Sequence, residues 1–386
     1  MNKPKLIRIT TVPLSLDKLL SGQLHYMNSF YDVVAISSGK EYLERVGKRE
    51  NVRTFHLEMS RKITPIHDLI AVLKLFWFLR NEKPHIVHTH TPKAGIVGML
   101  AAKLAGVPHR LHTVAGLPLL ETSGMKRTVL DFVERLTYAC ATKVYPNSFG
   151  LATIILQNNY CKATKLKVLA NGSSNGIATS FFNPELFSDS QNQLLRKQLG
   201  IHSTDFVFIF VGRLVGDKGI NEMVAAFTSL NRKQPHAKLL LVGDYEPELD
   251  PLLPETMSVI GNDASIISVG FQSEVRPYFS ISNCLVFPSY REGFPNVVLQ
   301  AGAMGLPSIV SDINGCNEII LKNKNGIILP VKDEQALYEA MNLICIDENL
   351  YHDLKNNSRQ QIVAFYEQKI VWNAILSEYT VLHYNR

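Results

Sequence analysis

The stretch Ser289-Tyr-Arg-Glu-Gly-Phe-Pro-Asn-Val-Val-Leu-Gln-Ala-Gly-Ala-Met-Gly305 decides the fold. It follows an apolar run, 284–288, that is typical of a buried parallel strand, and it leads into an apolar helical pattern. The start of such a helix offers free N–H groups and a partial positive charge to a phosphate. Glu292 would repel that phosphate, so its carboxylate is better suited to accept hydrogen bonds from hydroxyls attached to it. The stretch therefore predicts a site for a nucleotide-sugar.

Apolar, β-rich runs alternate with helical patterns along the rest of the chain. The expected strands are 5–10, 31–37, 85–89, 110–116, 143–147, 167–170, 206–211, 238–242, 266–269, 284–288 and 308–310. The expected helices include 65–80, 92–105, 126–140, 191–199 and 220–230. Repeated alternation of this kind predicts an α/β fold built on doubly wound parallel sheets.

The length of 386 residues predicts two domains. Turn-forming residues cluster at 171–176, which divides the chain into an N-terminal domain, 1–172, and a C-terminal domain, 173–365. The tail 366–386 has an amphipathic helical pattern, and we expect it to pack back on the first domain.

Residues 1–170 carry 24 Lys and Arg against 11 Asp and Glu, whereas the remainder carries 16 against 23. This asymmetry predicts different partners for the two domains, although a basic solvated surface without a specific partner stays an alternative.

The bulk composition narrows the class of protein. With 46% hydrophobic and 19% charged residues the chain is typical of a globular protein, and no apolar run reaches the ~18–20 residues of a membrane span. The N-terminal residues indicate a first strand rather than a signal peptide. The five cysteines are scattered without a CxxC spacing, which favours a reducing compartment. We therefore expect a cytoplasmic protein without a disulfide framework or a metal site.

A second motif, Phe210-Val-Gly-Arg-Leu-Val-Gly-Asp-Lys-Gly-Ile220, also leaves a strand, turns on glycines and enters a helix. Arg213 and Lys218 project from this turn, where two fixed cations can bind a diphosphate and stabilise it as a leaving group. The alternative is a surface turn with one salt bridge. Both motifs lie at the carboxyl ends of strands, where doubly wound folds bind their ligands.

The basic half contains a histidine-rich segment, 85–95, at the end of a strand. Thr91 and Pro92 suit a helix start, which places His90 and Lys93 beside it. His88 is expected in the core, and zinc binding is disfavoured because the histidines straddle both faces of a strand. His112 either reaches a substrate from a strand end or is a half-buried strand residue, and the sequence leaves both open.

Together these motifs resemble the retaining glycosyltransferase family 4, which has the two-domain GT-B fold. The resemblance is carried by Gly212-Arg213 with Lys218-Gly219, by Glu292-Gly293-Phe294-Pro295, and by Asn314-Gly315 with Glu318. The segments 87–108 and 110–119 look like bacterial members that build capsule, O-antigen, lipopolysaccharide or lipid-linked oligosaccharides. The resemblance implies two Rossmann-like domains facing across a cleft, with the acceptor on the first and the donor on the second.

The resemblance also implies roles for individual residues. Arg213 and Lys218 would hold the donor diphosphate, and Glu292 would bind sugar hydroxyls. Domain closure would bring His90, Lys93 and His112 towards the sugar and the acceptor. The donor-binding set is Gly212, Arg213, Lys218, Gly270, Phe271, Glu292, Gly293, Phe294, Pro295, Asn296, Val297 and Gln300, with Gly270-Phe271 beside the nucleobase. The catalytic set is Glu292, Arg213, Lys218, His90 and His112, and no metal ligand is expected.

Two positions depart from the family pattern. The family has a second glutamate eight positions after the first, which binds the ribose hydroxyls, where this chain has Gln300. A glutamine can still accept one such hydrogen bond and donate another. The family often has a histidine near the transferred sugar where this chain has Ala115, which puts in doubt any mechanism that requires that histidine.

The expected activity is transfer of a hexose or N-acetylhexosamine from a nucleoside-diphosphate sugar, with UDP as the expected nucleotide, to a lipid-linked or polysaccharide acceptor. Configuration would be retained, without a cofactor or a metal. The alternatives are a non-catalytic nucleotide-sugar or glycan-binding partner and a nucleotide-sugar epimerase. Nucleic acid is not an expected partner. The apolar segment 69–79, flanked by basic residues, either contacts an anionic membrane peripherally or forms a core helix.

Overall fold

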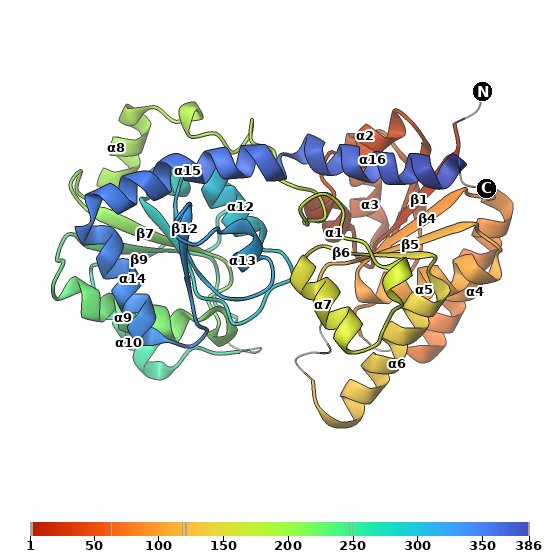
Figure 1. The fold of residues 1–386 in the computed structure, drawn as a ribbon, viewed down its shortest axis with the longest axis horizontal. Coiled ribbons are helices and arrows are strands. Elements are labelled where there is room, and N and C mark those ends of the chain that lie inside the picture. The colour runs from red at the N-terminus through yellow and green to blue at the C-terminus, as the bar shows by residue number, and fades with distance from the viewer. Residues whose placement is uncertain are drawn as a thin grey trace. The chain divides into compact units, whose positions relative to one another are not determined.

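The computed structural model describes residues 3–384 apart from 63, 118, 120, 121, 247 and 249. The chain divides into two compact units, Met1–Asn175 with Lys369–Arg386, and Gly176–Gln368. Each unit is a parallel sheet flanked by helices, as Figure 1 shows. The prediction of an α/β fold with two doubly wound parallel sheets is confirmed.

In the described part of the N-terminal unit, six parallel strands form a sheet in the order β3-β2-β1-β4-β5-β6. The strands are β1 (Lys5–Ile9), β2 (Asp32–Ser37), β3 (Arg53–His56), β4 (Ile86–His90), β5 (His109–Val114) and β6 (Lys143–Pro146). The central strands are buried on both faces because helices cover both sides of the sheet, which is why they contain nearly continuous apolar runs. The order reverses between β1 and β4, and in such sheets this point opens the ligand crevice.

Two groups of helices cover this sheet. One face packs on α4 (Pro65–Glu82), α5 (Pro92–Leu104), α6 (Gly124–Cys140) and α7 (Phe149–Gln157). The other face packs on α1 (Pro13–Leu19), α2 (Gln23–Asn28), α3 (Lys40–Glu50) and the C-terminal α16 (Gln368–Tyr384). In Figure 1, α16 lies in blue beside α2 and α3. Side chains of this last helix complete the hydrophobic core on this face of the N-terminal sheet.

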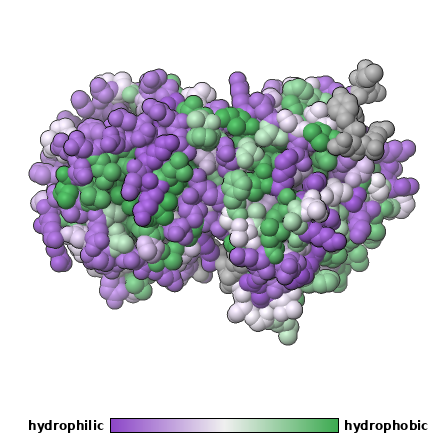
Figure 2. Space-filling view, in the orientation of Figure 1, coloured by the Kyte–Doolittle hydropathy of each residue, from purple (hydrophilic) through white to green (hydrophobic). Residues whose placement is uncertain are grey.

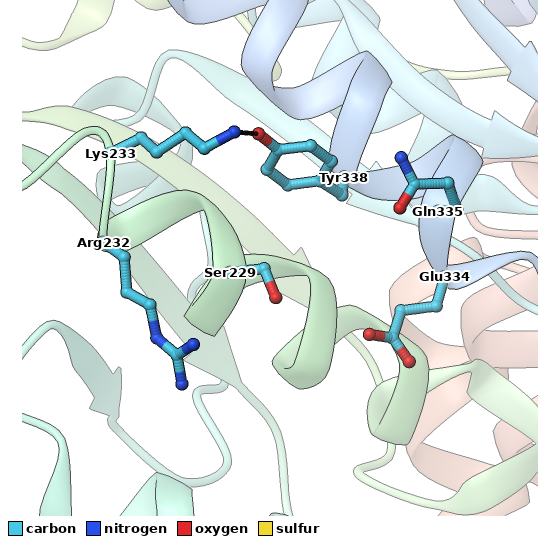
Figure 3. Close-up of a pocket in the computed structure, with 6 residues that line it drawn as sticks. All are labelled: Ser229, Arg232, Lys233, Glu334, Gln335 and Tyr338. Atoms are coloured by element: carbon cyan, nitrogen blue, oxygen red, sulfur yellow. Dashed lines mark hydrogen bonds between the residues drawn. The ribbon is translucent and has the colours of Figure 1, made fainter.

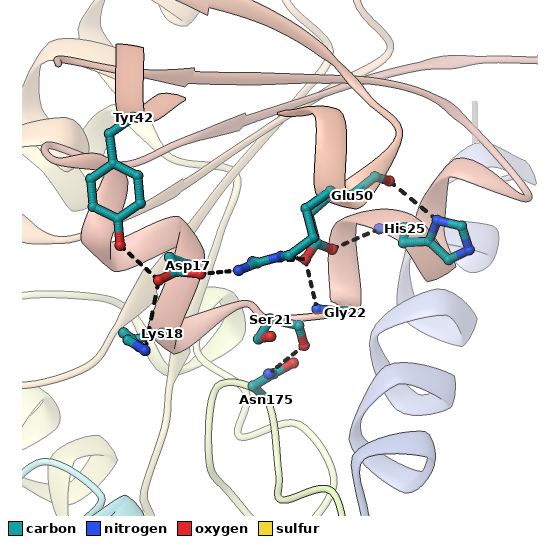
Figure 4. A network of polar contacts seen from close by, with 9 residues as sticks. Asp17, Lys18, Ser21, Gly22, His25, Tyr42, Glu50 and Asn175 are labelled. Carbon is teal, nitrogen blue, oxygen red and sulfur yellow. Dashed lines mark hydrogen bonds and ion pairs between the residues drawn. The ribbon is translucent and has the colours of Figure 1, made fainter. Parts of the chain in front are cut away.

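Polar contacts fix the first three helices to one another (Figure 4). Asp17 on α1 accepts a hydrogen bond from the Tyr42 hydroxyl at 2.7 Å and pairs with Arg49 of α3. Glu50, at the end of α3, accepts backbone N–H groups of Gly22 and His25 at 3.1 and 3.2 Å. The buried carboxylate of Glu50 thus holds the start of α2, which satisfies N–H groups that a helix leaves free.

Among the described residues of the C-terminal unit, the sheet again has six parallel strands, in the order β12-β11-β10-β7-β8-β9. They are β7 (Phe206–Val211), β8 (Ala237–Val242), β9 (Ile266–Ser268), β10 (Cys284–Phe287), β11 (Ser308–Ser311) and β12 (Gly326–Leu329). The helices are α8 (Asp189–Gln198), α9 (Ile220–Asn231), α10 (Pro254–Asn262), α11 (Arg276–Ser280), α12 (Asn296–Ala303), α13 (Cys316–Ile319), α14 (Glu334–Ile346) and α15 (Glu348–Tyr366). The order reverses between β7 and β10, so this unit repeats the topology of the first.

Three differences from the sequence expectations are instructive. The strand predicted at 167–170 is wrong: this segment joins the sheet edge only through the N–H of Lys167, and Ala170 adopts a left-handed conformation with φ 50°. The strands β3 and β12 were not predicted. Both are four-residue edge strands, and only their pairing with one neighbour makes them strands.

Taken over the described residues, no helix combines the length and the apolar character that crossing a bilayer would require.

Candidate functional site

The C-terminal unit brings two loops together at the switch point of its sheet, which is where the strand order reverses between β7 and β10. The loop after β7 contains Gly212–Gly219, and the loop after the adjacent β10 contains Ser289–Pro295. The close approach requires glycine at Gly219, which has φ 70° and where a Cβ would lie 2.3 Å from the carbonyl oxygen of Pro288. A Cβ at Gly315 would likewise lie 2.8 Å from the Cα of Phe294. These two glycines therefore let the backbones of three loops converge.

A half-buried ion pair joins the two loops. The Lys218 Nζ donates a hydrogen bond to Glu292 Oε1 at 2.5 Å and lies 3.5 Å from the hydroxyl of Ser289. The side chains of Lys218 and Glu292 are only 13% and 20% exposed. Partial burial weakens screening by water, so these charges act on a bound ligand more strongly than surface charges would. The sequence separates them by 74 positions, and the fold brings them into contact.

The second predicted cation is more exposed. Arg213 Nη1 lies 2.9 Å from Glu246 Oε2, with the two side chains 48% and 38% exposed. The hydrogen bond from Arg213 to Glu246 raises the pKa of the guanidinium, so Arg213 is a permanent positive charge. Sequence reasoning missed Glu246, which lies in the segment after β8.

Carboxylates outside the predicted site hold the Lys218 loop in place. Asp250 accepts the backbone N–H of Asp217 at 2.5 Å, and its own carbonyl accepts the N–H of Gly216. Asp217 pairs with Arg291 at 2.7 Å and, through its carbonyl, accepts the N–H of Tyr290 at 2.9 Å. The loops are therefore cross-linked beside the Lys218–Glu292 pair. Asp217 lies within the second motif and could have been singled out there, but nothing in the sequence connects it with Asp250.

The Tyr290 hydroxyl adds a further anchor by donating a hydrogen bond to Glu222 on α9. Burial, together with this carboxylate, raises the pKa of Tyr290, so the phenol stays a neutral donor. This contact ties the β10 loop to the helix that begins directly after Gly219.

The helix α12 starts at the end of the β10 loop. Pro295 precedes it without a side-chain cap, so the N-terminus of α12 keeps donors and a partial positive charge that suit an anion. Gly293 and Phe294 lie in the loop before it, Asn296 is its first residue, and Val297 and Gln300 follow on the helix, where both are partly buried. The predicted phosphate-binding amides therefore lie on the same loop as Glu292.

The predicted base-binding residues lie after β9. Gly270 has φ 66°, and its carbonyl accepts the N–H of Gly243 at 2.9 Å. Phe271 is 69% exposed, while its N–H donates to Asp244 at 3.0 Å. An aromatic ring held this far out of the core can stack on a planar ligand.

The two predicted histidines of the N-terminal unit, His90 and His112, are buried. His90 is 3% exposed at the end of β4 and stacks on His88 with ring centroids 4.4 Å apart. Lys93 forms an ion pair with Asp68 of α4. Burial lowers the pKa of His90 well below its ordinary value, so this imidazole is neutral. The core position predicted for His88 is confirmed, since its ring nitrogens bond Tyr379 at 2.5 Å and Thr113 at 2.7 Å.

His112 lies on the opposite face of the same sheet. It is 3% exposed, its Nδ1 bonds the Thr89 hydroxyl at 2.8 Å, and a Cβ at Gly95 would lie 2.6 Å from its ring. The ring is fully buried rather than half-buried, and it packs under α5 instead of at the open end of the strand. The catalytic role expected for His112 therefore stays a prediction without structural support.

One further polar pocket of the C-terminal unit lies away from these loops. A shallow pocket of about 260 Å³ lies between α9 and α14 (Figure 3), where Lys233 donates a hydrogen bond to the Tyr338 hydroxyl at 2.8 Å. It is lined by Ser229, Arg232, Lys233, Glu334, Gln335 and Tyr338, none of which belongs to the loops at the switch point. Within the described ranges, no group of three or more His, Cys, Asp or Glu could hold a metal ion.

Comparisons with known proteins agree with this architecture. Residues 191–361 match the family model "Glycosyl transferases group 1", and residues 24–172 match "Glycosyl transferase 4-like domain". The chain is 31% identical over 380 residues, 98% of its length and 97% of the relative, to the capsular polysaccharide biosynthesis glycosyltransferase CapM of Staphylococcus aureus. It is 29% identical over 318 residues to the UDP-Gal:alpha-D-GlcNAc-diphosphoundecaprenol alpha-1,3-galactosyltransferase of Escherichia coli, covering 81% and 80% of the two chains.

A solved structure shares the fold. Anabaena HepE in complex with UDP and glucose superimposes with a TM-score of 0.81 at 17% identity, covering 98% of this chain and 100% of that chain. The expected GT-B fold is confirmed.

Proposed function

This chain belongs to glycosyltransferase family 4, and from that premise we propose that it transfers a hexose or N-acetylhexosamine from a UDP-sugar to a lipid-linked or polysaccharide acceptor with retention of configuration. The observation that carries the proposal is the contact of Lys218 with Glu292 at the switch point of the C-terminal sheet. It brings a cation that would suit a diphosphate and a carboxylate that would suit sugar hydroxyls together on adjacent loops. The E. coli and Anabaena relatives, whose names include UDP-Gal and UDP, support UDP as the nucleotide.

The geometry of the loops supports the donor-binding roles that we propose. Lys218 and Arg213 would hold the diphosphate, with the amides at the start of α12 against its oxygens. Glu292 would accept hydrogen bonds from the sugar, and Phe271 would border the base. Gln300 would bind a ribose hydroxyl through its neutral amide.

Fixed cations also suit the chemistry of transfer. The bond from the anomeric carbon to the diphosphate oxygen breaks with its electron pair on the diphosphate, where Lys218 and Arg213 would stabilise the developing charge. The acceptor hydroxyl would attack the same face of the sugar, so configuration is retained. Its proton would pass to the departing diphosphate oxygen, which balances the step without a covalent sugar–protein intermediate.

The test is a screen of nucleotide-sugars followed by product analysis. We expect a UDP-sugar to raise the melting temperature of the full chain, because a ligand that binds only the folded state stabilises it. Incubation with that sugar and a lipid-linked acceptor should give a glycosylated acceptor and UDP. Nucleotide binding without transfer would favour a non-catalytic binding protein, and an isomeric sugar formed without an acceptor would favour an epimerase.

We also propose that the N-terminal unit contacts an anionic membrane peripherally. One face of α4 is buried, but its other face exposes apolar side chains at helical spacing, and α6 does the same; these exposed residues are Ile66, Leu69, Ile70, Leu73, Trp77, Met125, Val129 and Phe132. Exposed basic residues lie among them, including Lys74, Arg80 and Lys126. Figure 2 shows green and purple side chains interspersed over this region. Apolar residues with a basic surround are suited to a bilayer interface with anionic headgroups.

Flotation with anionic liposomes tests this surface. The double variant Leu69→Ser/Trp77→Ser should lose binding while its circular dichroism is unchanged, because both side chains are exposed, at 60% and 64%. Leu194→Ser is the matched control, since Leu194 on α8 is also 60% exposed and lies in the other unit. Equal binding by the double variant and the control would contradict the proposed contact.

A further inference from the structure

Every cation of the C-terminal switch point already has a carboxylate partner, but the partners differ in what else they can do. Glu292, which pairs with Lys218, has a role of its own in the proposed donor site. Glu246, which pairs with Arg213 at 2.9 Å, has none. A carboxylate that pairs with a diphosphate-binding arginine competes with the diphosphate for that arginine.

The backbone puts Glu246 beside Arg213. Leu214 and Tyr245 form a parallel bridge, and the N–H of Leu214 donates to the carbonyl of Asp244 at 2.9 Å. The residues next to Arg213 and to Glu246 are therefore bonded to each other, and the two side chains emerge from paired backbone. The backbone pairing beyond the carboxyl ends of β7 and β8 therefore holds the two side chains near each other.

We propose that Glu246 is an internal competitor for the donor diphosphate: it neutralises Arg213 in the nucleotide-free site, must release it when UDP binds, and by reclaiming it promotes UDP release. This inference rests on the proposed function, in which Arg213 binds the diphosphate. A guanidinium binds a phosphate best when one of its forks of N–H groups is free to make two parallel bonds, and the bond from Nη1 to Glu246 engages the fork that Nη1 and Nη2 form. The Glu246 carboxylate would also repel a diphosphate bound next to it.

Removing the Glu246 charge should strengthen UDP binding modestly, whereas most substitutions in a binding site weaken it. An exposed ion pair changes an equilibrium constant only a few-fold, so we expect Glu246→Gln to lower the Kd for UDP about fivefold. The same substitution should strengthen inhibition by the product UDP. Few random changes in a binding site tighten it, which makes the direction diagnostic.

The experiment is calorimetric titration of the full chain with UDP at one fixed ionic strength. Glu248→Gln is the matched control: it removes the same charge from an exposed position in the same segment, two residues away. We expect Glu246→Gln to bind UDP about fivefold more tightly and Glu248→Gln to bind it as the unmodified chain does. In an Arg213→Ala background the gain from Glu246→Gln should shrink, because the competition has been removed.

Each outcome separates the two proposals. If Arg213→Ala weakens UDP binding but Glu246→Gln leaves it unchanged or weaker, the competitor role of Glu246 is refuted and the donor-binding role of Arg213 stands. Equal tightening by Glu248→Gln, or a gain that persists fully without Arg213, also overturns the competitor, since either result means general charge repulsion. If Arg213→Ala binds UDP normally, Arg213 is not a diphosphate ligand, so its donor-binding role and the competitor role of Glu246 are both wrong, while the proposal for Lys218 and Glu292 stands.

Discussion

The two sheets have the same strand order, yet their switch points contain polar groups of opposite character. After β7 and β10 the charges lie on glycine-rich loops, partly exposed and paired across the loops, as Lys218 and Glu292 are. At β1 and β4 the polar side chains lie within the strands, where Arg8 and His88 are fully buried under α16. A polar residue within one of these strands is therefore buried, whereas a polar residue on the loop after a strand stays partly exposed.

Burial determines the chemistry of the N-terminal set. Arg8 donates to the Tyr379 hydroxyl at 2.7 Å and to Gln23, both neutral partners, and burial lowers the pKa of its guanidinium. Burial also lowers the pKa of His88 well below its ordinary value. These groups form a hydrogen-bonded network that attaches α16 to the sheet. The comparison predicts that substitutions at the C-terminal switch point impair activity, whereas those in the N-terminal network impair stability.

The largest effect is expected at Lys218. Lys218→Ala should lower kcat/KM by roughly a thousandfold, because it removes a charge that stabilises the leaving diphosphate. The melting temperature should change little, since the side chain lies at the edge of the core rather than within it. Transfer assays beside thermal unfolding measure both; a variant with near-normal turnover would remove Lys218 from the donor site.

The next effect is a loss of stability in acid that originates in the N-terminal unit. Burial lowers the pKa of His112 from 6.5 to about 4. Between pH 4 and pH 6.5 the unfolded chain binds a proton on His112 that the folded chain does not bind. The neutral, buried His112 therefore contributes about 3 kcal/mol to the free energy of unfolding above pH 6.5, and this contribution is lost as the pH falls towards 4. The buried His88 and His90 act in the same direction.

Urea unfolding at pH 7.5 and 4.5 tests this contribution. His112→Asn should show a smaller drop between the two pH values than the unmodified chain, because its side chain does not titrate. His202→Asn, at an exposed histidine of the C-terminal unit, should show the full drop. Equal pH dependence in all three would contradict a neutral buried His112.

A smaller loss is expected at Tyr379. Tyr379→Phe removes the hydroxyl that bonds Arg8 Nη1 and His88 Nδ1, and leaving these two buried atoms without that partner should cost about 1–3 kcal/mol of unfolding free energy. Turnover per folded molecule should be unchanged. Tyr338→Phe removes an exposed hydrogen bond to Lys233 and should cost much less. If Tyr379→Phe impaired turnover without loss of stability, the separation between the two regions would fail.

The smallest effect is expected at Asp250, which acts through the Lys218 loop. Asp250→Ala should raise the KM for the donor about fivefold, because losing a capping bond costs about 1 kcal/mol and lets the turn 216–218 relax. The kcat should change less than the KM. Asp263→Ala removes a similar bond in the same unit, which the Asp263 carboxylate accepts from the N–H of Ser265 at 2.8 Å. An equal effect of both variants on KM would mean that Asp250 is merely structural.

The sequence was informative wherever local chemistry and local structure coincide. Lys218, Glu292 and the start of α12 could be singled out because glycines, an apolar strand and a helical pattern surround each of them within a few residues. Asp250 and Glu246 could not, since the second motif ends 26 and more positions before them and only pairing between β7 and β8 brings their segments together. The edge strands β3 and β12 were also missed, because each is only four residues long, RTFH and GIIL, and so short a run becomes a strand only beside a partner.

By itself the sequence determined the fold class, most of the strands, and the two loops that build the site, because apolar periodicity and turn residues act over short distances. Only the tertiary structure decided which polar residues are available to a ligand. Lys218 remains available because its strand ends before it, whereas His112 and Arg8 are covered by α5 and α16, whose packing depends on residues far away in the chain. Burial is a property of the assembled core, and a histidine or arginine in a sequence does not reveal it.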